Sequence, residues 1–428
     1  GLAYALEKYG TISLSQALKP AIDLAEKGFI VSQELATSLS TYKDSLAKHA
    51  STKQVFFKND GNTYQAGDLF IQPDLATSLK LIAQHGIKAF YQGELAEKIV
   101  AHIKINGGIM ALTDLATYKP LVRKPVQGTY RGYTVYSMPP PSSGGTHLIQ
   151  MLNMLEQYPL QKMGATSPKT IHLLAETMRR AYADRSTHIG DPHFVSVPTQ
   201  ELTNKLYAKK ITQSIKQNKA SLSTAIKAGS PESFSEKHDT THYSVMDKWG
   251  NVVSNTYTLN TSYGMKGVVD GTGILLNNEM DDFTAKPGFK NAYGLITNEK
   301  NKIEPGKRML SSMTPTIVMK EAKPFLVTGS PGGSHIITTV LQIISYVIDH
   351  KMDIATATYA PRIHHQWLPD ILSVEKGINT ATIQALKEMG HKVEEMPPSG
   401  AANSIVFQNN VFFGLADPRR LDGATLGF

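Results

Sequence analysis

The sequence of 428 residues contains no cysteine. Disulfide bonds, catalysis by a cysteine thiolate and metal sites built from thiolates are therefore excluded. No long apolar run occurs either. The longest, Ile336 to Ile348, is shorter than the roughly 20 residues that span a bilayer and carries polar side chains, so it predicts a buried helix and no membrane span. HExxH and EF-hand spacings are also absent, which argues against a metal ion.

Positive charge is abundant but dispersed. The formal net charge is +8, yet lysines and arginines never form a block of about five or six. Without a basic stripe or a motif that reads nucleic acid, this charge indicates a solvated surface and no nucleic-acid partner. The length allows a large core, either in one α/β unit or in two domains.

The pattern changes from mostly helical in the first half to mostly strands after Thr240. Apolar residues at helical spacing precede glycines that favour helix ends, while alternating β-branched and aromatic residues indicate strands. The predicted helices in the first half are Leu14 to Gly28, Asp74 to His85, Glu94 to Ile105, His147 to Glu156, Ser167 to His188 and Asn204 to Lys216, with one strand at Thr129 to Ser137.

The stretch Asp239 to Asn260 has the pattern of a β-hairpin that begins with two threonines. Turn residues at Asp247 to Asn251 separate an alternating first strand from a returning strand at Val252 to Tyr257. A long polar segment, Gln217 to Asp239, precedes Thr240. Such a segment is a place where the chain can be cut without disturbing a core.

A threonine exposed as a new N-terminus combines a nucleophile and a base. Its hydroxyl attacks while its own α-amine, with an unperturbed pKa of about 7.7 to 8.0, takes the proton at neutral pH. No histidine partner is needed. Thr258 and Asn260 lie two residues apart and so share one strand face, either beside the Thr240 hydroxyl or directed outward like ordinary strand residues.

Several short motifs follow one another along the chain. They are TTHYSV from Thr240, YTLN from Tyr257, GILLNNEMDDF from Gly273, LSSM from Leu310 and GSPGGS from Gly329. Their order and spacing resemble those of the γ-glutamyltranspeptidases, most closely the bacterial ones. The resemblance covers nearly the whole chain, because MPPPSSGG from Met138, AYADR from Ala181 and HHQWLPD from His364 are also similar to that family.

The resemblance implies an α+β fold, the four-layer αββα sandwich of the N-terminal nucleophile hydrolases. Periodicity alone predicts only mixed α and β structure. The resemblance further implies that the Asp239 to Thr240 bond is cut autocatalytically, by attack of the Thr240 hydroxyl on the preceding carbonyl, an N to O acyl shift and hydrolysis of the ester. We therefore expect a large-subunit part, 1–239, and a small subunit, 240–428, that associate as a heterodimer and form one structural unit.

The same resemblance assigns the site. Thr240 is the nucleophile, Thr258 hydrogen-bonds its hydroxyl, and Asn260 binds substrate. Gly332 and Gly333, which a tight turn would also explain, form the oxyanion hole, because backbone N–H groups at a helix start are suitable donors. The remaining implied substrate-binding residues are Glu279 and Asp282 for the α-ammonium of the glutamyl group, Ser311 and Ser312 for its α-carboxylate, and Tyr293, either as part of a lid or as a structural tyrosine.

The implied reaction is γ-glutamyl transfer from glutathione or a related amide to Thr240, then to water or to an amino-acid or peptide acceptor, without a cofactor. Bacterial members are mostly periplasmic or secreted, which gives the expected location. They also carry a substantial preceding segment, with an arginine that holds the α-carboxylate and that no arginine here matches. Because the sequence begins at Gly1 without an initiator methionine or a signal peptide, we expect either an N-terminally truncated chain or one piece of a longer one.

Three alternatives stay open. A cephalosporin-type acylase shares the scaffold, although the residues for the glutamyl ammonium argue against it. An inactive truncated fragment is the second. The third is a serine hydrolase that uses Ser330, since T-G-S-P-G is one residue short of the nucleophile-elbow pattern, but Pro331 has no N–H for an oxyanion hole.

Overall fold

The computed structural model describes residues 1–226, 240–289, 291–296 and 298–427. The chain forms two compact units: unit 1 comprises Gly1–Arg123 and Ser262–Asn278, and unit 2 comprises Lys124–Thr261 and Glu279–Phe428. This division concerns compactness, whereas the predicted division into 1–239 and 240–428 concerns a cut in the backbone and stays a prediction. Asp239 itself lies outside the described residues.

Unit 1 is mainly helical, as the periodicity predicted. Helix α2 begins at a capping box, in which Ser13 Oγ accepts a hydrogen bond from Gln16 N–H, and ends at Gly28 with a φ of 80°. The segment Ser262–Asn278 contacts these helices through a hydrogen bond from Ser51 Oγ to Val268 O at 2.6 Å. The elements are α1 (Leu2–Tyr9), α2 (Leu14–Lys27), β1 (Phe29–Ile30), α3 (Gln33–Thr41), α4 (Lys43–Leu46), α5 (Ala50–Phe56), β2 (Leu69–Phe70), α6 (Pro73–His85), α7 (Lys88–Tyr91), α8 (Glu94–Ile105), α9 (Leu112–Thr117), β7 (Val268–Val269) and β8 (Ile274–Leu275).

Unit 2 contains a six-stranded antiparallel sheet in the order β15-β14-β10-β9-β4-β3. The main elements of unit 2 are β3 (Val126–Tyr130), β4 (Tyr133–Ser137), α10 (Gly144–Leu155), α11 (Leu160–Met163), α12 (Pro168–His188), α13 (Thr199–Leu202), α14 (Lys205–Thr212), β5 (Thr240–Met246), β6 (Val252–Thr258), β9 (Thr316–Lys320), β10 (Lys323–Thr328), α15 (His335–Ile348), α16 (Ile354–Tyr359), β11 (Ile363–His364), β12 (Leu372–Glu375), α17 (Thr380–Glu388), β13 (Val393–Met396), β14 (Ser404–Gln408) and β15 (Val411–Leu415).

The sheet is built from hairpins with two-residue turns. Both turn residues have positive φ in the β3–β4, β9–β10 and β14–β15 hairpins, a geometry that matches the right-handed twist of the paired strands. The prediction of one strand from Thr129 to Ser137 is therefore wrong, because Arg131 and Gly132 turn the chain between β3 and β4.

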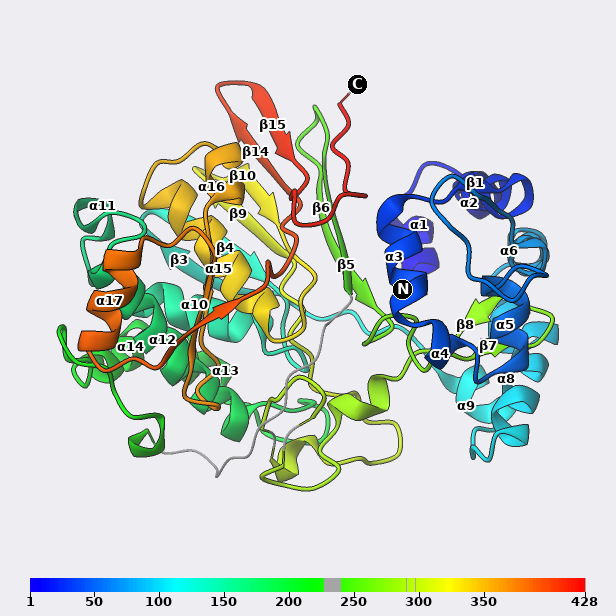
Figure 1. Cartoon of the computed structure of the whole chain (residues 1–428), viewed down its shortest axis with the longest axis horizontal. Coiled ribbons are helices and arrows are strands. Elements are labelled where there is room, and N and C mark those ends of the chain that lie inside the picture. Colours follow the sequence, from blue (N-terminus) through cyan, green and yellow to red (C-terminus); the bar gives the residue numbers. More distant parts are fainter. Residues whose placement is uncertain (227–239, 290, 297, 428) are drawn as a thin grey trace. The chain divides into compact units, whose positions relative to one another are not determined.

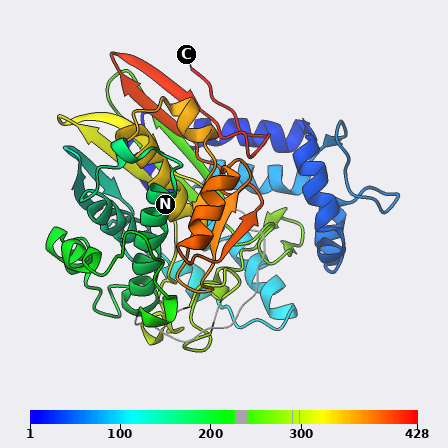
Figure 2. The same cartoon turned by 60° about the vertical axis from the view of Figure 1, so that its left-hand side comes forward.

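Unit 2 is layered. Helices α10, α12 and α15 gather on one side of the six-stranded sheet, and the hairpin β5–β6 lies against β10 and β14 on the other (Figures 1 and 2). Polar contacts join the two sheets: Ser254 Oγ of β6 donates to Thr328 O of β10 at 2.9 Å, and Asn403 Nδ2 donates to His242 O of β5 at 2.7 Å. Unit 2 thus has a helix layer and two sheet layers in succession, and the α+β prediction is confirmed.

Two helices differ from their predicted bounds. α14 ends at Thr212, short of Lys216, and α10 begins at Gly144, before the predicted His147. The early start of α10 depends on glycine, because a Cβ at Gly144 would lie 2.2 Å from Met313 O. The start of α10 therefore packs directly against the loop that carries Ser311 and Ser312. The prediction that Ile336 to Ile348 is a buried helix is confirmed by α15.

Among the described residues, no helix combines the length and the apolar character that crossing a membrane requires.

Candidate active site

One pocket of unit 2 brings together eight of the ten predicted site residues. Gly332 and Glu279 are the two that do not line it, but Gly332 directly precedes the lining residue Gly333, and Glu279 acts electrostatically on Asp282. Three further lining residues, Leu295, Met313 and Ile336, were not predicted. The eight are Thr240, Thr258, Asn260, Asp282, Tyr293, Ser311, Ser312 and Gly333.

Thr240 is the first residue of β5 and is paired with Thr258 of β6. Its side chain is buried, and its Oγ1 donates to Thr258 Oγ1 at 3.4 Å. The Thr258 oxygen also accepts a hydrogen bond from the backbone N–H of Asn260 at 2.7 Å. The arrangement leaves the Thr240 oxygen as a donor to its neighbour, with its lone pairs not used in this bond, as a nucleophile requires.

Asn260 and Tyr293 are coupled directly. Asn260 has a φ of 75°, a conformation that asparagine tolerates better than most residues. The Tyr293 hydroxyl donates to Asn260 O at 2.7 Å and also contacts Asn260 Oδ1. Both residues are buried, so this hydroxyl fixes the backbone turn that follows β6. In this structure Tyr293 lines the pocket and orients another lining residue.

Gly332 and Gly333 lie in the connection from β10 to α15. Their φ values are 132° and 53°, in the region that favours glycine, and a Cβ on Gly332 would approach Gly400 Cα to 3.3 Å. Within the part of the chain that the structure describes, neither backbone N–H donates to an acceptor. The start of α15 therefore offers two N–H donors, one of them at the pocket wall, that a ligand oxygen can use.

Asp282 and Glu279 form the acidic side of the site, on a short 3-10 helix. Burial, and next the charge of Glu279, raise the pKa of Asp282 well above its usual range, against the opposing effect of Arg185. Burial also raises the pKa of Glu279 to about 7. Asn291 Nδ2 donates to Asp282 Oδ1 at 3.2 Å. A bound cation would favour the charged form of both carboxyl groups, so this part of the site suits an ammonium group.

The serine pair lies opposite the start of α10. Ser311 O accepts hydrogen bonds from both the N–H and the hydroxyl of Ser143, each at 2.8 Å. Ser312 Oγ accepts a hydrogen bond from Arg185 Nη2 at 3.1 Å. The MPPPSSGG and AYADR motifs therefore meet at the LSSM loop, although they are far apart in the sequence.

Comparison with known proteins shows the family. The family model described as gamma-glutamyltranspeptidase matches residues 1–427. The chain belongs to the γ-glutamyltranspeptidase family. It is similar to the glutathione hydrolase proenzyme of Escherichia coli strain K12, with 50% identity over 430 residues that cover 100% of this chain and 74% of that relative. The prediction of an enzyme of the glutathione hydrolase type is confirmed.

Solved structures give the same fold. The γ-glutamyltranspeptidase of Helicobacter pylori is 51% identical, with a TM-score of 0.53, over 53% of this chain and 65% of that chain. A cephalosporin acylase from Bacillus halodurans is 27% identical, with a TM-score of 0.85, over 99% of this chain and 76% of that chain. The predicted fold of the N-terminal nucleophile hydrolases is therefore confirmed.

Ser330, the alternative nucleophile, has its hydroxyl engaged on both sides. The oxygen accepts a hydrogen bond from Ala401 N–H at 2.9 Å, and the proton goes to Pro331 O at 2.6 Å. The residue is fully buried and does not line the pocket. In the γ-glutamyltranspeptidase fold Ser330 thus stabilises the turn before Gly332. These contacts argue against the serine-hydrolase alternative.

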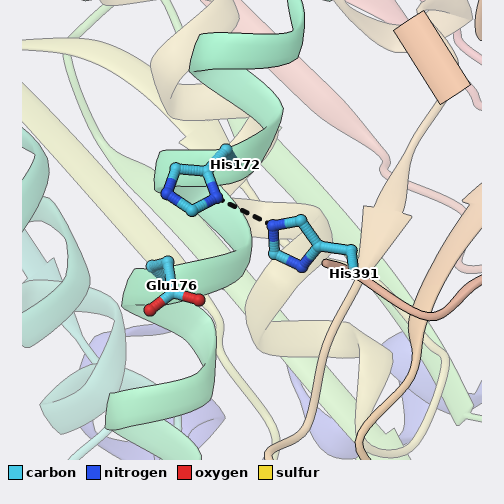
Figure 3. Close-up of side chains that lie close together, drawn as sticks. All are labelled: His172, Glu176 and His391. Carbon is cyan, nitrogen blue, oxygen red and sulfur yellow. Dashed lines mark hydrogen bonds between the residues drawn. The ribbon is translucent and has the colours of Figure 1, made fainter. Parts of the chain in front are cut away.

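One group of three potential metal ligands occurs among the described residues: His172, Glu176 and His391 (Figure 3). His172 Nδ1 and His391 Nε2 share a hydrogen bond of 2.8 Å, and His172 Nε2 faces Lys216 O at 2.8 Å. Glu176 is occupied by the guanidinium groups of Arg179 and Arg180.

Since a carbonyl only accepts, neutral His172 carries its proton on Nε2, and its Nδ1 accepts from His391. Most of the imidazole and carboxylate atoms that would bind a metal thus already form hydrogen bonds or ion pairs within the protein. The guanidinium groups of Arg179 and Arg180 also place two positive charges beside them. Burial lowers the pKa of His391 to about 3, so the pair is neutral at ordinary pH. These contacts are those of a structural network that ties α12 to the loop before β13.

Sequence reasoning missed two arginines of the site. Arg185, the last residue of AYADR, reaches Ser312 and Ser143. Arg420 Nη1 donates to the backbone O of Thr240 at 3.2 Å and so holds the first residue of β5. The motif AYADR was visible in the sequence, but the contacts of Arg185 and Arg420 join residues 127 and 180 positions apart.

Proposed function

We propose that this enzyme transfers and hydrolyses the γ-glutamyl group of glutathione and related γ-glutamyl amides through an acyl-enzyme on Thr240. The observation that carries the proposal is that one pocket is lined by a threonine hydroxyl, a glycine with a backbone N–H donor just before a helix, a carboxyl group suited to an ammonium, and a serine pair suited to a carboxylate. A γ-glutamyl group needs all four, because it has an electrophilic carbonyl, an α-ammonium and an α-carboxylate.

The nucleophile must first be released. The Thr240 hydroxyl attacks the carbonyl carbon of Asp239, the peptide nitrogen leaves as the Thr240 amine, and an ester joins the two residues. Water then hydrolyses the ester, which gives a fragment ending at Asp239 and one beginning at Thr240. The two fragments, 1–239 and 240–428, stay associated as a heterodimer. The word proenzyme in the name of the E. coli relative supports this step.

Catalysis then uses the freed amine. It accepts the proton of Thr240 Oγ1 as that oxygen bonds to the γ-carbonyl carbon, and the oxyanion accepts from the N–H groups of Gly332 and Gly333. The carbon to nitrogen bond breaks, and the leaving amine takes the proton back. Water resolves the ester to glutamate, and an amino-acid or peptide amine resolves it to a new γ-glutamyl compound.

Recognition rests on the two charged groups at the donor's α-carbon, the α-ammonium and the α-carboxylate. Asp282, with Glu279 behind it, receives the α-ammonium, while the hydroxyls of Ser311 and Ser312 donate to the α-carboxylate. Asn260, fixed by Tyr293, contacts the substrate between them. No cofactor takes part in these steps. A periplasmic or secreted location is part of the proposal, following the bacterial relatives.

An acylase is the second candidate, because the B. halodurans acylase has a similar fold. The buried acidic pair argues against it. Burial disfavours the charged forms of Asp282 and Glu279, and an α-ammonium would compensate that charge, whereas an acyl group without an α-ammonium would not.

The experiment compares hydrolysis of a γ-glutamyl anilide with hydrolysis of the glutaryl anilide, which lacks only the α-amine. We expect the purified protein to consist of two fragments and to hydrolyse the γ-glutamyl anilide with the higher kcat/KM. Thr240→Ala should remain one chain without activity. Thr241→Ala, a change at the exposed neighbouring threonine, is the matched control and should be cut and active.

Cleavage or turnover that persists in Thr240→Ala would refute the assigned nucleophile. A kcat/KM that is higher for the glutaryl anilide would favour the acylase. A protein that is cut but turns over neither anilide would point to the inactive-fragment alternative.

A further inference from the structure

Arg185 differs from the other buried arginines of the chain. The described residues include four arginines with buried side chains, Arg179, Arg180, Arg185 and Arg362. Arg179 and Arg180 are paired with Glu176, and Arg362 is paired with Asp417. Arg185 forms no ion pair with a carboxylate of the described residues, and its Nη1 is buried without a hydrogen-bond acceptor among them.

An uncompensated buried charge is costly, and native proteins keep one mainly where a partner or a function needs it. Burial lowers the pKa of Arg185 to about 10, so the guanidinium still carries its charge at neutral pH. The acidic side chains that act on it electrostatically are Tyr182 and, after it, Asp282, which lines the pocket. Arg185 therefore lies beside a pocket residue, while no carboxylate of the described residues pairs with it.

The contacts of Arg185 control both serines of the pocket. Nη2 donates to Ser312 Oγ at 3.1 Å. Nε donates to Ser143 Oγ at 2.9 Å, and that hydroxyl donates in turn to Ser311 O at 2.8 Å. One guanidinium thus fixes the Ser312 side chain directly and the Ser311 backbone through Ser143.

The hydrogen bonds of the two serine side chains also determine whether their hydroxyls can donate or accept. Ser312 Oγ accepts from Arg185, and Ser311 Oγ accepts from Met313 N–H at 3.1 Å. Neither hydroxyl donates to an acceptor within the described part of the chain. Both hydroxyl protons are therefore available to a ligand in the pocket. Each of the two oxygens already accepts one hydrogen bond from the protein.

We propose that Arg185 is a positioning residue for the α-carboxylate of the donor, which it serves by holding Ser311 and Ser312 as hydroxyl donors and by placing a positive charge behind them. The inference rests on the proposed function, since it assigns the serine side of that pocket to a carboxylate. Arg185 does not line the pocket, so it acts through Ser312 and through its charge, not by direct contact.

The test measures binding, and so does not depend on turnover. L-Glutamate and its α-amide differ only at the α-carboxyl group, where the amide has no charge and replaces one acceptor oxygen with an NH2 donor. Calorimetry with the purified protein should show a preference for glutamate of about tenfold or more, as expected for hydrogen bonds to a charged group. Arg185→Gln should remove most of this preference by weakening glutamate about tenfold, while binding of the α-amide changes little.

Arg180→Lys is the matched control, since Arg180 is a buried arginine on the same helix α12 with a carboxylate partner. It should keep the preference. Arg185→Lys retains the positive charge but not the several N–H donors of the guanidinium, and it should retain part of the preference for glutamate. This second variant keeps the test possible if Arg185→Gln does not fold. In a Ser312→Ala background, Arg185→Lys should cause a smaller further loss than in the wild type, because part of its effect passes through that serine.

A loss of affinity that is equal for glutamate and the α-amide would mean that Arg185 is only structural or only balances Asp282, and would overturn the inference. So would a wild-type protein without a preference. A protein that binds glutamate with the preference but turns over no γ-glutamyl anilide would refute the proposed reaction and leave this inference standing.

Discussion

Replacing Glu279 with glutamine should make the protein more stable, and increasingly so as the pH rises. Burial raises the pKa of Glu279 from its ordinary value of 4.5 to about 7. Between these values the folded protein keeps a proton that the unfolded chain has lost. The free energy of unfolding therefore falls as the pH rises through this window, and the whole loss is present above about pH 7.

The magnitude follows from the pKa. The difference between 4.5 and about 7, at about 1.36 kcal/mol per pH unit, amounts to about 3 kcal/mol. Because Glu279 is only half-buried, this is an upper value. Glutamine has a similar shape and no charge. It also removes the repulsion that raises the pKa of Asp282, an effect of the same sign.

The assay is urea unfolding of both proteins at several pH values from 4.5 to 8. The stability of Glu279→Gln relative to wild type should grow by about 1 to 3 kcal/mol across this range. The control is Glu304→Gln, because Glu304 is also partly exposed but a hydrogen bond from Lys307 lowers its pKa. That substitution should show no gain with pH. Parallel pH profiles for wild type and Glu279→Gln would refute the reasoning about the acidic pair.

Three further predictions concern single contacts. Tyr293→Phe removes the donor to the buried Asn260 oxygens, which should raise KM for a γ-glutamyl anilide roughly tenfold by steady-state kinetics. Gly332→Ala forces a strained φ beside the N–H donors and should lower kcat about a hundredfold, with fragments still formed. Arg420→Gln weakens the bond to Thr240 O and should slow the appearance of the two fragments roughly tenfold, as followed by gel electrophoresis.

Matched controls keep these predictions specific. Tyr346→Phe also removes a buried tyrosine hydroxyl, one that donates to Pro361 O, and should leave KM unchanged. Gly250→Ala also alters a glycine with positive φ, but in open space, and should leave kcat unchanged. If a control changes activity as much as its partner, or if Arg420→Gln is cut at the wild-type rate, the corresponding contact does not have the stated role.

The sequence predicted most elements whose signals are local. The β5–β6 hairpin shows strand alternation and turn residues within one short stretch, and α12 has Ser167 as its N-cap and Pro168 at its start. The strand predicted at Thr129 to Ser137 was wrong because its alternation continues across the turn. The break is seen in the positive φ of Arg131 and Gly132, and a positive φ is uncommon for a non-glycine residue such as Arg131.

The site could be predicted only in part. Seven of the eleven residues that line the pocket were predicted from the ordered motifs, because each motif carries its site residues on a short segment. Arg185 and Arg420 were not predicted as site residues, since nothing near them in the sequence indicates a contact more than a hundred residues away. The burial that raises the pKa of Asp282 also depends on tertiary packing, which no spacing of residues reports.

The central claim is that Thr240 carries the γ-glutamyl group. The most direct test is to mix the protein with a γ-glutamyl anilide, quench with acid within the first turnovers, and locate the added mass by tandem mass spectrometry. We expect one γ-glutamyl group on the fragment that begins at Thr240, attached to its first residue. A label on Ser330 or on any other residue, or rapid anilide release without a label in the first turnover, would contradict it.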